Sequence, residues 1–252
     1  MSTIDGWDEE TFTAEGYTRT VFRRGVGPGV VVIHEIPGVT PRVIAFAEEV
    51  VAAGFTVVMP SLVGDPGRPF SPRYAMTSMA KACIAKEFTT WATGRTSPIV
   101  TWLRALAADL HDRCGGPGVG AVGMCLTGGF ALGMMVDDRL IAPVLSQPSL
   151  PLAVPKLPGW RTRGADLNLS PEDLARVEER AAAGCPVLGL RYEGDALVGT
   201  RFETLRRELG DAFIAVELPS SSSRDHSVLT EHRHDPTVVQ VLEFFRDRLL
   251  PG

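Results

Sequence analysis

The fold of this chain is decided by one uncharged stretch, Val119-Gly120-Ala121-Val122-Gly123-Met124-Cys125-Leu126-Thr127-Gly128-Gly129-Phe130. It begins as a short run of small and β-branched residues, which is typical of a strand that is buried on both faces of a sheet. A pair of glycines then leads into a second apolar run. The pattern predicts a strand, a very tight turn with Cys125 in it, and a helix over residues 130–135.

Such a turn has the geometry of a nucleophile elbow, in which a strained backbone lifts one side chain above the end of a sheet. The lifted side chain here is the thiol of Cys125. It would lie at a helix N-terminus, where the helix dipole favours the reactive thiolate. The alternative interpretation is that Cys125 is only a small buried apolar residue in a Gly-rich turn.

The composition places limits on the class of protein. The 252 residues are 44% hydrophobic and 22% charged, which is enough apolar material for one large core, so we expect a single domain over residues 1–252. The formal net charge is -5 without a long run of one sign, and this argues against a nucleic-acid partner. No apolar run approaches the ~20 residues that span a bilayer, so no membrane partner is expected.

The four cysteines lie at positions 83, 114, 125 and 185, without a CxxC pair. They form no Cys/His cluster at zinc spacing, so neither a metal ion nor another cofactor is expected. The first residues have neither the basic region nor the apolar core of a signal peptide. We therefore expect free thiols in the reducing cytoplasm, in a protein that is a monomer or a homodimer.

Strand and helix patterns alternate along the chain. The expected strands are residues 18–23 (at an edge of the sheet), 30–33, 55–59, 119–124, 140–146, 185–190 and 213–216. The other expected helices are residues 41–53, 77–93, 98–112, 170–184, 202–209 and 237–249, with loops at 61–72 and 147–169. This order predicts an α/β fold with a mostly parallel central sheet and helices on both faces.

Two further side chains follow predicted strands downstream of Cys125. Asp195 comes after the strand that ends at residue 190, and His226 comes after the strand that ends at residue 216. Because catalytic groups gather at the carboxyl ends of strands in open α/β sheets, the three side chains should meet at one edge. His226 can then take the thiol proton, and Asp195 can hold the imidazole in one tautomer.

Each of these assignments has an alternative. Asp195 can instead cap a nearby helix, and Asp225 is a second candidate for the acid. We favour Asp195, because Asp225 is adjacent to His226 and adjacent residues rarely face one another well enough to form the orienting bond. His232 and His234 are further candidates for the base, although both lie in a polar segment farther from the strand end.

Four segments together resemble the dienelactone hydrolase family, and they occur in the family's order. They are His34-Glu35-Ile36-Pro37-Gly38-Val39, Gly123-Met124-Cys125-Leu126-Thr127-Gly128-Gly129, Gly194-Asp195 and Asp225-His226-Ser227. The first is the most discriminating, because Glu followed by an Ile-x-Gly-Val stretch after a buried strand is unusual outside this family. The resemblance runs from about residue 30 to the end of the chain and implies the α/β-hydrolase fold.

The resemblance also implies roles for individual residues. It implies a triad of Cys125, His226 and Asp195, and an oxyanion hole formed by the backbone N–H groups of Ile36 and Leu126. It further implies that Glu35 lies beside the thiol and governs its protonation, so that the nucleophile is fully activated only when substrate binds. On its residue type alone, Glu35 at the end of a buried strand needs a partner or a raised pKa, and both are frequent in active sites. The alternative is a structural residue that is hydrogen-bonded to loop amides.

Three features depart from the family pattern. Thr127 stands in the elbow where the family's simplest pattern has glycine. The 147–169 segment is longer than the minimal family needs, which makes it a candidate lid or insertion and its Trp160 a candidate substrate-binding residue. Lys86 is a candidate substrate-facing cation, by analogy with the arginine that the family uses for a carboxylate.

The function that these features imply is a cysteine-dependent hydrolase, which acts on a small lactone or ester through an acyl-thioester intermediate. Two alternatives stay open. One is a biosynthetic enzyme that carries out a non-hydrolytic or epoxide-opening step in the same pocket, because a fold does not fix its chemistry. The other is a non-catalytic ligand-binding protein.

Overall fold

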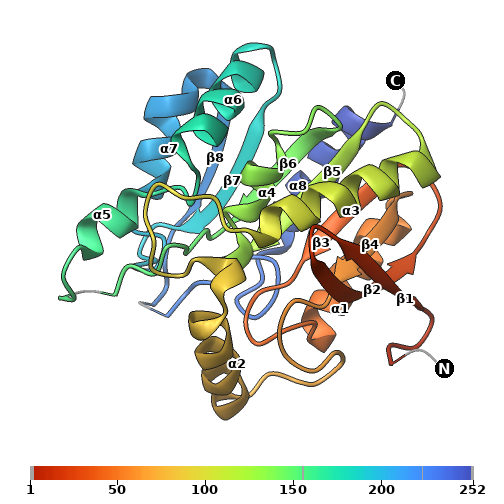
Figure 1. Cartoon of the computed structure of the whole chain (residues 1–252), viewed down its shortest axis with the longest axis horizontal. Coiled ribbons are helices and arrows are strands. Elements are labelled where there is room, and N and C mark those ends of the chain that lie inside the picture. The colour runs from red at the N-terminus through yellow and green to blue at the C-terminus, as the bar shows by residue number, and fades with distance from the viewer. Residues whose placement is uncertain (1–2, 155, 223, 251–252) are drawn as a thin grey trace.

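A computed structural model describes residues 3–154, 156–222 and 224–250. Its strands are β1 (Asp8–Ala14), β2 (Tyr17–Arg24), β3 (Gly29–Ile33), β4 (Thr56–Pro60), β5 (Val119–Met124), β6 (Leu140–Ser146), β7 (Val187–Tyr192) and β8 (Phe213–Leu218). They form one eight-stranded sheet in the order β1-β2-β4-β3-β5-β6-β7-β8 (Figure 1). From β4 to β8 all neighbours in this order are parallel, whereas β2 is antiparallel to both β1 and β4.

The α-helices are α1 (Pro41–Ala52), α2 (Pro72–Ile84), α3 (Ile99–Cys114), α4 (Phe130–Met134), α5 (Trp160–Ala165), α6 (Pro171–Ala182), α7 (Arg201–Leu209) and α8 (Asp235–Leu249). Short 3-10 turns occur at η1 (Lys86–Phe88), η2 (Cys125–Thr127) and η3 (Gly210–Ala212). Helices α1, α2 and α6 begin in the same way, with a hydroxyl N-cap followed directly by proline. The side chains of the three caps, Thr40, Ser71 and Ser170, each accept a hydrogen bond from the backbone N–H three residues later.

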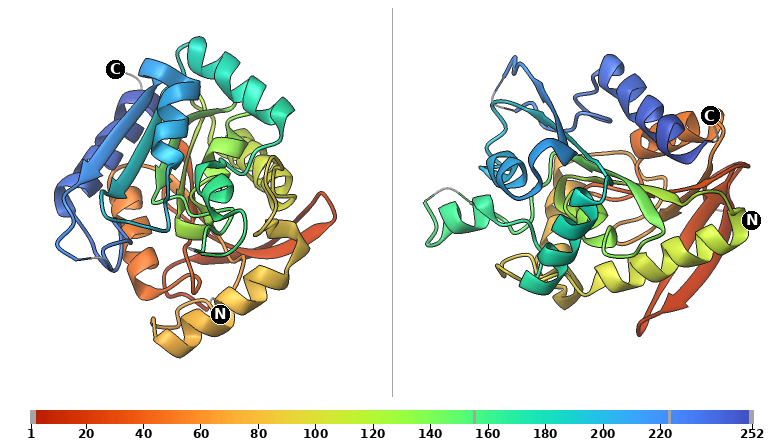
Figure 2. Two further views of the ribbon diagram at one scale, coloured as in Figure 1. Left: turned by 90° about the vertical axis from the view of Figure 1, so that its left-hand side faces the viewer. Right: turned by 90° about the horizontal axis from the view of Figure 1, so that it is seen from above.

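Helices cover both faces of the sheet. Successive side chains of a strand point to opposite faces, so Val30 and Val32 of β3 pack in one core cluster with α1 and α8. Val31 and Ile33 pack in the other cluster, with α2, α3, α4, α6 and α7. Figure 2 shows α1 and α8 together on one side of the sheet and α3 and α6 on the other. The α/β class, the mostly parallel sheet and the two helical layers are therefore confirmed.

Some element boundaries differ from the expectation. The strand expected at 18–23 is β2, but it does not lie at the edge, because β1 pairs along its whole length outside it. The helix expected at 77–93 begins earlier and ends earlier, as α2, and is followed by η1. The loop expected at 147–169 contains the short helix α5.

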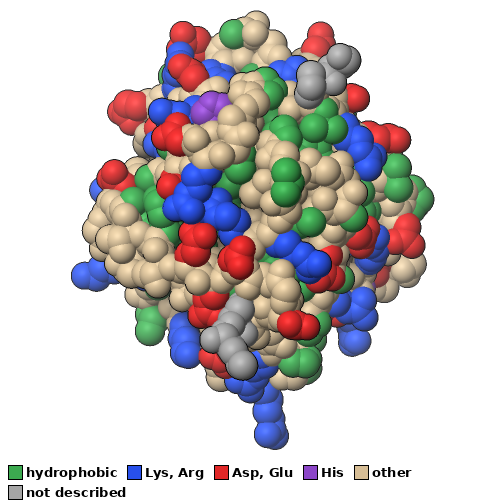
Figure 3. All heavy atoms as spheres, turned by 90° about the vertical axis from the view of Figure 1, so that its right-hand side faces the viewer, with side chains coloured by type: hydrophobic (Ala, Val, Ile, Leu, Met, Phe, Trp, Pro, Cys, Tyr) green, Lys and Arg blue, Asp and Glu red, His purple; other side chains and the backbone are tan. Residues whose placement is uncertain are grey.

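Figure 3 shows the side of the molecule with β1 and β2, where acidic and basic side chains are interspersed. Arg23 of β2 and Arg113 of α3 both form ion pairs with Glu10 of β1 and with Asp109 of α3. Across the described ranges of the chain, no helix combines the length and the apolar character needed to cross a membrane.

Candidate active site

Five neighbouring strands deliver polar or nucleophilic side chains to one edge of the sheet. In sheet order, β3, β5, β6, β7 and β8 are followed by Glu35, Cys125, Gln147, Asp195 and His226. All five strands are parallel, so their carboxyl ends meet at the same edge. The first four of these residues are buried, and His226 is partly buried.

Cys125 occupies a strained turn at the end of β5. Its φ angle is 54°, in the left-handed region, which costs a non-glycine residue roughly 1–3 kcal/mol. The neighbouring glycines make this turn possible. A Cβ at Gly123 would lie 2.2 Å from the carbonyl oxygen of Thr127, and a Cβ at Gly128 would lie 2.5 Å from Cα of Pro148. The stretch therefore folds as the sharp strand-to-helix elbow that its glycines predict.

Thr127 ties this elbow to the neighbouring strand. Its hydroxyl accepts a hydrogen bond from the N–H of Met124 at 3.0 Å. The same oxygen lies 3.2 Å from the carbonyl oxygen of Ile33 and 3.1 Å from that of His34, at the end of β3. Thr127 thus supplies a cross-strand contact that glycine at this position could not make.

The helix that follows the thiol is short. Cys125 starts the three-residue turn η2, and the α-helical part, α4, has only five residues. A macrodipole is the sum of aligned peptide dipoles, so this element supplies less stabilisation to a thiolate than a long helix does. A neighbouring cation becomes the more important influence on the thiol.

That neighbour is the imidazole of His226. Its Nδ1 lies 2.6 Å from Oδ2 of Asp195. Oδ1 of Asp195 accepts a hydrogen bond from the N–H of Leu197 at 3.0 Å, so both carboxylate oxygens are used. Nε2 of His226 is buried and is the ring nitrogen left to serve Cys125, whose side chain acts on the imidazole through both charge and hydrogen bonding.

Electrostatics favour a protonated His226. Burial alone lowers the pKa of the imidazole, but attraction to the negative charge that Cys125 carries when ionised opposes it, together with the hydrogen bond to Asp195. The net effect raises the pKa of His226 well above its ordinary value of 6.5. The arrangement therefore suits a thiolate–imidazolium pair held by a buried carboxylate.

The structure also places the alternative acid and bases. Asp225 accepts hydrogen bonds from the backbone and hydroxyl groups of Ser221 and Ser222, which lower its pKa to about 2, so it closes its own loop. Nδ1 of His232 lies 3.3 Å from the backbone nitrogen of His226 and accepts its N–H. His234 is the N-cap residue of α8, and its Nδ1 lies 2.8 Å from Oγ1 of Thr237. The geometry pairs His226 with Asp195 and not with Asp225.

Glu35 is a buried hub between three strand ends. Its Oε2 accepts hydrogen bonds from Oγ of Ser227 at 2.7 Å and from Nε2 of Gln147 at 3.3 Å. Its Oε1 accepts a short hydrogen bond from the hydroxyl of Thr230. Ser227 and Thr230 belong to the loop that carries His226, so Glu35 is bound to that loop. In the described structure no hydrogen bond joins Glu35 to Cys125.

The environment of Glu35 disfavours its charge. Burial raises its pKa, while the hydrogen bonds from Thr230 and Ser227 and the attraction of His226 act in the opposite direction. The net shift is upward. A carboxylate with a raised pKa beside the loop that carries His226 is therefore able to respond to protonation changes in the site.

The loop after β3 is fixed by a neutral histidine. His34 is fully buried, and desolvation lowers its pKa to about 4. Its Nδ1 lies 2.8 Å from the carbonyl oxygen of Glu35, and its Nε2 accepts the N–H of Leu62 at 3.0 Å. These bonds hold the backbone immediately before Ile36, and Leu126 follows Cys125 as the second residue of the 3-10 turn η2.

The two candidate substrate residues lie apart from one another. Lys86 is exposed in η1, where its neighbour Glu87 pairs with Arg19 of β2. Trp160 starts α5 in the 147–169 segment and lines a hollow of about 340 Å³ between that segment and the turn after Asp195. The hollow is also lined by Ala153, Arg161, Gly164, Ala196, Gly199 and Thr200. The structure brings Trp160 near the turn that follows Asp195 and leaves Lys86 on the surface.

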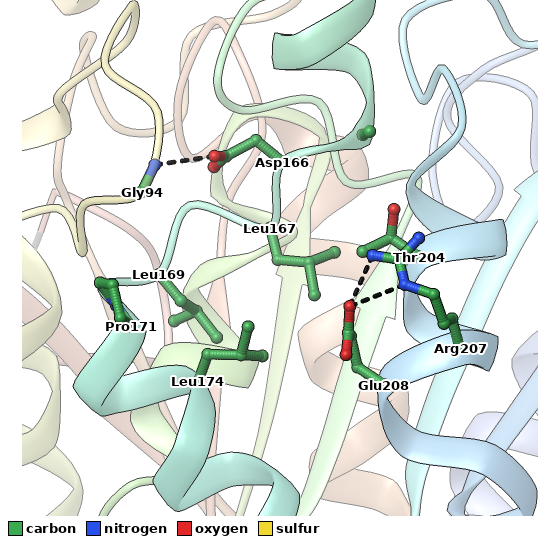
Figure 4. A pocket seen from close by; sticks show the side chains of 10 residues that line it. Gly94, Asp166, Leu167, Leu169, Pro171, Leu174, Thr204, Arg207 and Glu208 are labelled. Carbon is green, nitrogen blue, oxygen red and sulfur yellow. Dashed lines mark hydrogen bonds and ion pairs between the residues drawn. The ribbon is translucent and has the colours of Figure 1, made fainter.

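A second hollow lies on the far side of the same segment. It measures about 260 Å³ and lies between α6 and α7, lined by apolar side chains such as Leu167, Leu169 and Leu174 (Figure 4). Figure 4 also shows Asp166 directed towards Gly94, whose N–H donates to Oδ2 of Asp166 at 2.7 Å. None of the strand-end residues lines this hollow or the one beside Trp160, but the Trp160 hollow is lined by Ala196, the residue after Asp195.

Two hubs were not predicted from the sequence. Gln147 is fully buried with a left-handed φ of 36°, and its side chain bridges Glu35 and the N–H of Val228. The position of Gln147 directly after the apolar strand β6 was the sequence signal that could have identified it. Arg201 is buried at the start of α7, where an isolated arginine in sequence gave no warning. In the described ranges no group of three or more His, Cys, Asp or Glu residues is placed to hold a metal ion.

Comparisons with solved structures identify the fold. A Klebsiella pneumoniae protein described provisionally as a dienelactone hydrolase has a TM-score of 0.63 at 18% identity, covering 96% of this chain and 97% of that one. A dienelactone hydrolase from Anabaena variabilis has a TM-score of 0.62 at 14% identity, with 96% and 98% covered. A cold-adapted esterase from an Arctic intertidal metagenomic library has a TM-score of 0.62 at 16% identity, with 99% and 100% covered. The architecture is thus the α/β-hydrolase fold, as the resemblance implied.

Sequence similarity identifies the family as well as the fold. None of the curated proteins that were compared matches the chain. The sequence profile of the dienelactone hydrolase family, however, matches residues 16–241, which is most of its length. The chain therefore belongs to the dienelactone hydrolase family and is a hydrolase of ester bonds.

Proposed function

We propose that this hydrolase uses Cys125 as its nucleophile and cleaves a small lactone or ester through an acyl-thioester. The observation that carries the proposal is the buried Asp195–His226 bond of 2.6 Å, next to a thiol on a strained elbow. His226 has one ring nitrogen bound to the acid, and the imidazole also interacts with the side chain of Cys125. This is the division of labour that a nucleophile, base and acid require.

In the first half of the reaction, the Cys125 sulfur attacks the carbonyl carbon of the substrate while His226 holds the thiol proton. The negative charge moves to the carbonyl oxygen, where the N–H groups of Ile36 and Leu126 would stabilise it. Collapse of this intermediate forms the thioester and breaks the carbon–oxygen bond, and His226 returns its proton to the leaving alkoxide. With a lactone, the new hydroxyl stays attached to the acyl group.

In the second half, His226 takes a proton from water, and the resulting hydroxide attacks the thioester carbonyl. The carbon–sulfur bond breaks, the acid leaves, and the Cys125 thiolate is restored beside the imidazolium. Asp195 supports both halves, because its carboxylate fixes Nδ1 of His226 and so directs Nε2 towards the sulfur. Glu35 supports the same base through the Ser227 and Thr230 hydroxyls.

The hollow beside Trp160 would hold the non-reacting part of the substrate. Its lining combines the Trp160 ring and small apolar side chains with one cation, Arg161, whose guanidinium carbon lies 5.3 Å from the centroid of that ring. Such a lining suits an apolar group with a nearby anionic substituent. Lys86 would then act only on a substrate that extends over the surface at η1. The four free thiols support a reducing compartment such as the cytoplasm.

The experiment compares turnover of p-nitrophenyl acetate by the wild type, Cys125→Ala and Cys83→Ala. We expect Cys125→Ala to lose activity and Cys83→Ala to keep it, because burial raises the pKa of Cys83 and leaves it mostly un-ionised at neutral pH. Iodoacetamide should inactivate the wild type by labelling residue 125, with protection by substrate. Brief quenching should trap one acetyl group on the peptide that contains Cys125.

Full activity of Cys125→Ala, or inactivating label confined to another thiol, would refute the cysteine mechanism. A burst of p-nitrophenol with the acetyl group trapped on a residue other than Cys125 would refute both the acyl-thioester and Cys125 as the nucleophile.

A further inference from the structure

Arg201 is a buried charge that no role assigned above explains. Its side chain is 1% exposed, at the first position of α7, although arginine is almost never fully buried without partners. Burial lowers the pKa of Arg201 to about 10, with attraction to Asp166 and Asp195 acting against this shift. The guanidinium therefore stays charged at neutral pH, which makes its burial costly unless every donor is satisfied.

All of its hydrogen bonds go to backbone carbonyls, and these belong to two segments. In the 147–169 segment, Nε donates to Leu150 and Asp166 at 3.0 Å each, and Nη2 donates to Arg163 at 2.7 Å and to Pro151. In the acid turn, which we define as residues 195–198, Nη1 donates to Leu197 at 3.0 Å and to Val198 at 2.8 Å. The rigid fork of one side chain thus fastens the two segments together.

The acid turn passes this restraint directly to the catalytic acid. The carbonyl of Leu197 is held by Arg201, and the N–H of the same residue donates to Oδ1 of Asp195 at 3.0 Å. Oδ2 of Asp195 in turn holds Nδ1 of His226 at 2.6 Å. The backbone of Leu197 therefore links Arg201 to Asp195 through one hydrogen bond on each side, and Asp195 in turn binds His226.

The 147–169 segment also meets residues 199–200, directly after the acid turn, backbone to backbone. The N–H of Thr200 donates to the carbonyl of Gly164 at 2.9 Å. Gly199 has a φ of +61°, and a Cβ there would lie 2.7 Å from the oxygen of Gly164. The hollow lined by Trp160 lies between these same two segments, so the spacing that Arg201 and Gly199 set is also the spacing of its walls.

We propose that Arg201 is a positioning residue for Asp195, which fixes the acid turn against the 147–169 segment and thereby aims the carboxylate at His226. This inference rests on the proposed roles of Asp195 and His226 in the hydrolase. It assigns no contact with substrate to Arg201, which acts only through the acid turn. A second consequence is that a displacement of the 147–169 segment is transmitted to the acid.

The chain provides a matched control in Arg180. Its side chain is 9% exposed and also donates to backbone carbonyls, at Met135, Asp137, Asp138 and Leu140. These carbonyls lie at and before the start of β6, at the opposite edge of the sheet from Cys125. Arg180 also lies 3.4 Å, through Nε, from Oδ1 of Asp138. It is therefore a second buried arginine that holds backbone carbonyls, and it has no contact with the acid turn.

The experiment measures kcat and the midpoint of thermal unfolding for Arg201→Lys and Arg180→Lys, each alone and in the Asp195→Ala background. Lysine keeps the charge but cannot reach carbonyls in a planar fork. We expect both single variants to lose thermal stability, whereas only Arg201→Lys loses kcat, by about tenfold or more. In the Asp195→Ala background, Arg201→Lys should lower kcat by less than about twofold, because its effect passes through that carboxylate.

Gly199→Ala tests the same restraint without changing Arg201, and it serves if Arg201→Lys fails to fold. The added Cβ should push the two segments apart, lower kcat, and show the same loss of effect in the Asp195→Ala background. Equal losses of kcat in Arg201→Lys and Arg180→Lys would overturn the proposal, as would undiminished losses in the Asp195→Ala background. If Asp195→Ala itself left kcat unchanged, the proposed triad would be refuted instead.

Discussion

Oε2 of Glu35 accepts a hydrogen bond from Oγ of Ser227 at 2.7 Å, across 192 positions of sequence. Ser227 directly follows His226, so the bond joins the loop after β3 to the loop that carries the base. The family resemblance implies that Glu35 acts on the thiol. The hydrogen bonds of this structure give it a more direct connection to the imidazole, and the two roles predict opposite effects on thiol reactivity.

Replacing Glu35 with glutamine should slow the alkylation of Cys125 by iodoacetamide at neutral pH. In its ionised form Glu35 attracts the His226 imidazolium, so removing this carboxylate weakens the cation that stabilises the thiolate. Turnover should fall at the same time. Rates are compared with those of Glu193→Gln, a change of the same type at an exposed position. Faster alkylation in Glu35→Gln would show that like-charge repulsion between Glu35 and the thiol dominates, as the resemblance implies.

The same substitution should change how stability depends on pH. Because burial raises the pKa of Glu35 in the folded state, the folded protein binds this proton more tightly than the unfolded chain does. The resulting stabilisation is fully present below the ordinary pKa of about 4.5 and is lost as the pH rises through the raised folded-state pKa. The free energy of unfolding of the wild type relative to Glu35→Gln, from urea titrations, should therefore fall across that window. A constant difference would mean that the folded state leaves this pKa unshifted.

Replacement of the histidines should separate the base from its neighbours. His226→Ala should lower kcat by roughly three to five powers of ten, as removal of a triad member does. His234→Ala should stay near the wild type, because its ring bonds Thr237 in the cap of α8. His232→Ala should show an intermediate loss, since its ring accepts the backbone N–H of His226. If His234→Ala lost its activity while His226→Ala stayed active, the assignment of His226 as the base would be wrong.

The sequence was sufficient to predict a site residue where that residue follows a strand with a clear apolar pattern. Uncharged apolar runs predicted β3, β5 and β6. The positions after β5, β7 and β8 indicated Cys125, Asp195 and His226 as a group at one edge. The start of α2 was also readable, because Ser71 and the proline after it repeat the capping pattern of α6. The helix was expected five residues too late, since its apolar pattern is weak there.

The sequence was insufficient where a side chain acts across distant segments. Nothing in the local pattern shows that Ser227 and Thr230 hold Glu35, because the partners are separated by more than 190 positions. The same is true of Arg201, whose acceptors are carbonyl groups that every residue carries. Register between non-adjacent loops follows from packing of the whole sheet, and short sequence patterns do not encode it.

Thr127→Val should destabilise the protein and impair turnover. Valine keeps the shape of the side chain but leaves the buried N–H of Met124 without its acceptor, and it removes the contacts with the carbonyls of Ile33 and His34. An unsatisfied buried donor costs about 1–3 kcal/mol, which in a chain of this size lowers the unfolding midpoint by roughly 2–12 °C.

Thr127→Ser retains the hydroxyl and should recover most of both losses, while Thr101→Val, at an exposed position of α3, should change neither. The measurements are thermal unfolding followed by circular dichroism, and kcat on p-nitrophenyl acetate. Because the hydroxyl fixes the elbow to the strand that leads into Glu35 and Ile36, kcat should fall in the folded Thr127→Val protein at a temperature well below its midpoint. If the midpoint dropped while kcat held, the bond would stabilise the fold without placing Cys125 relative to the loop after β3.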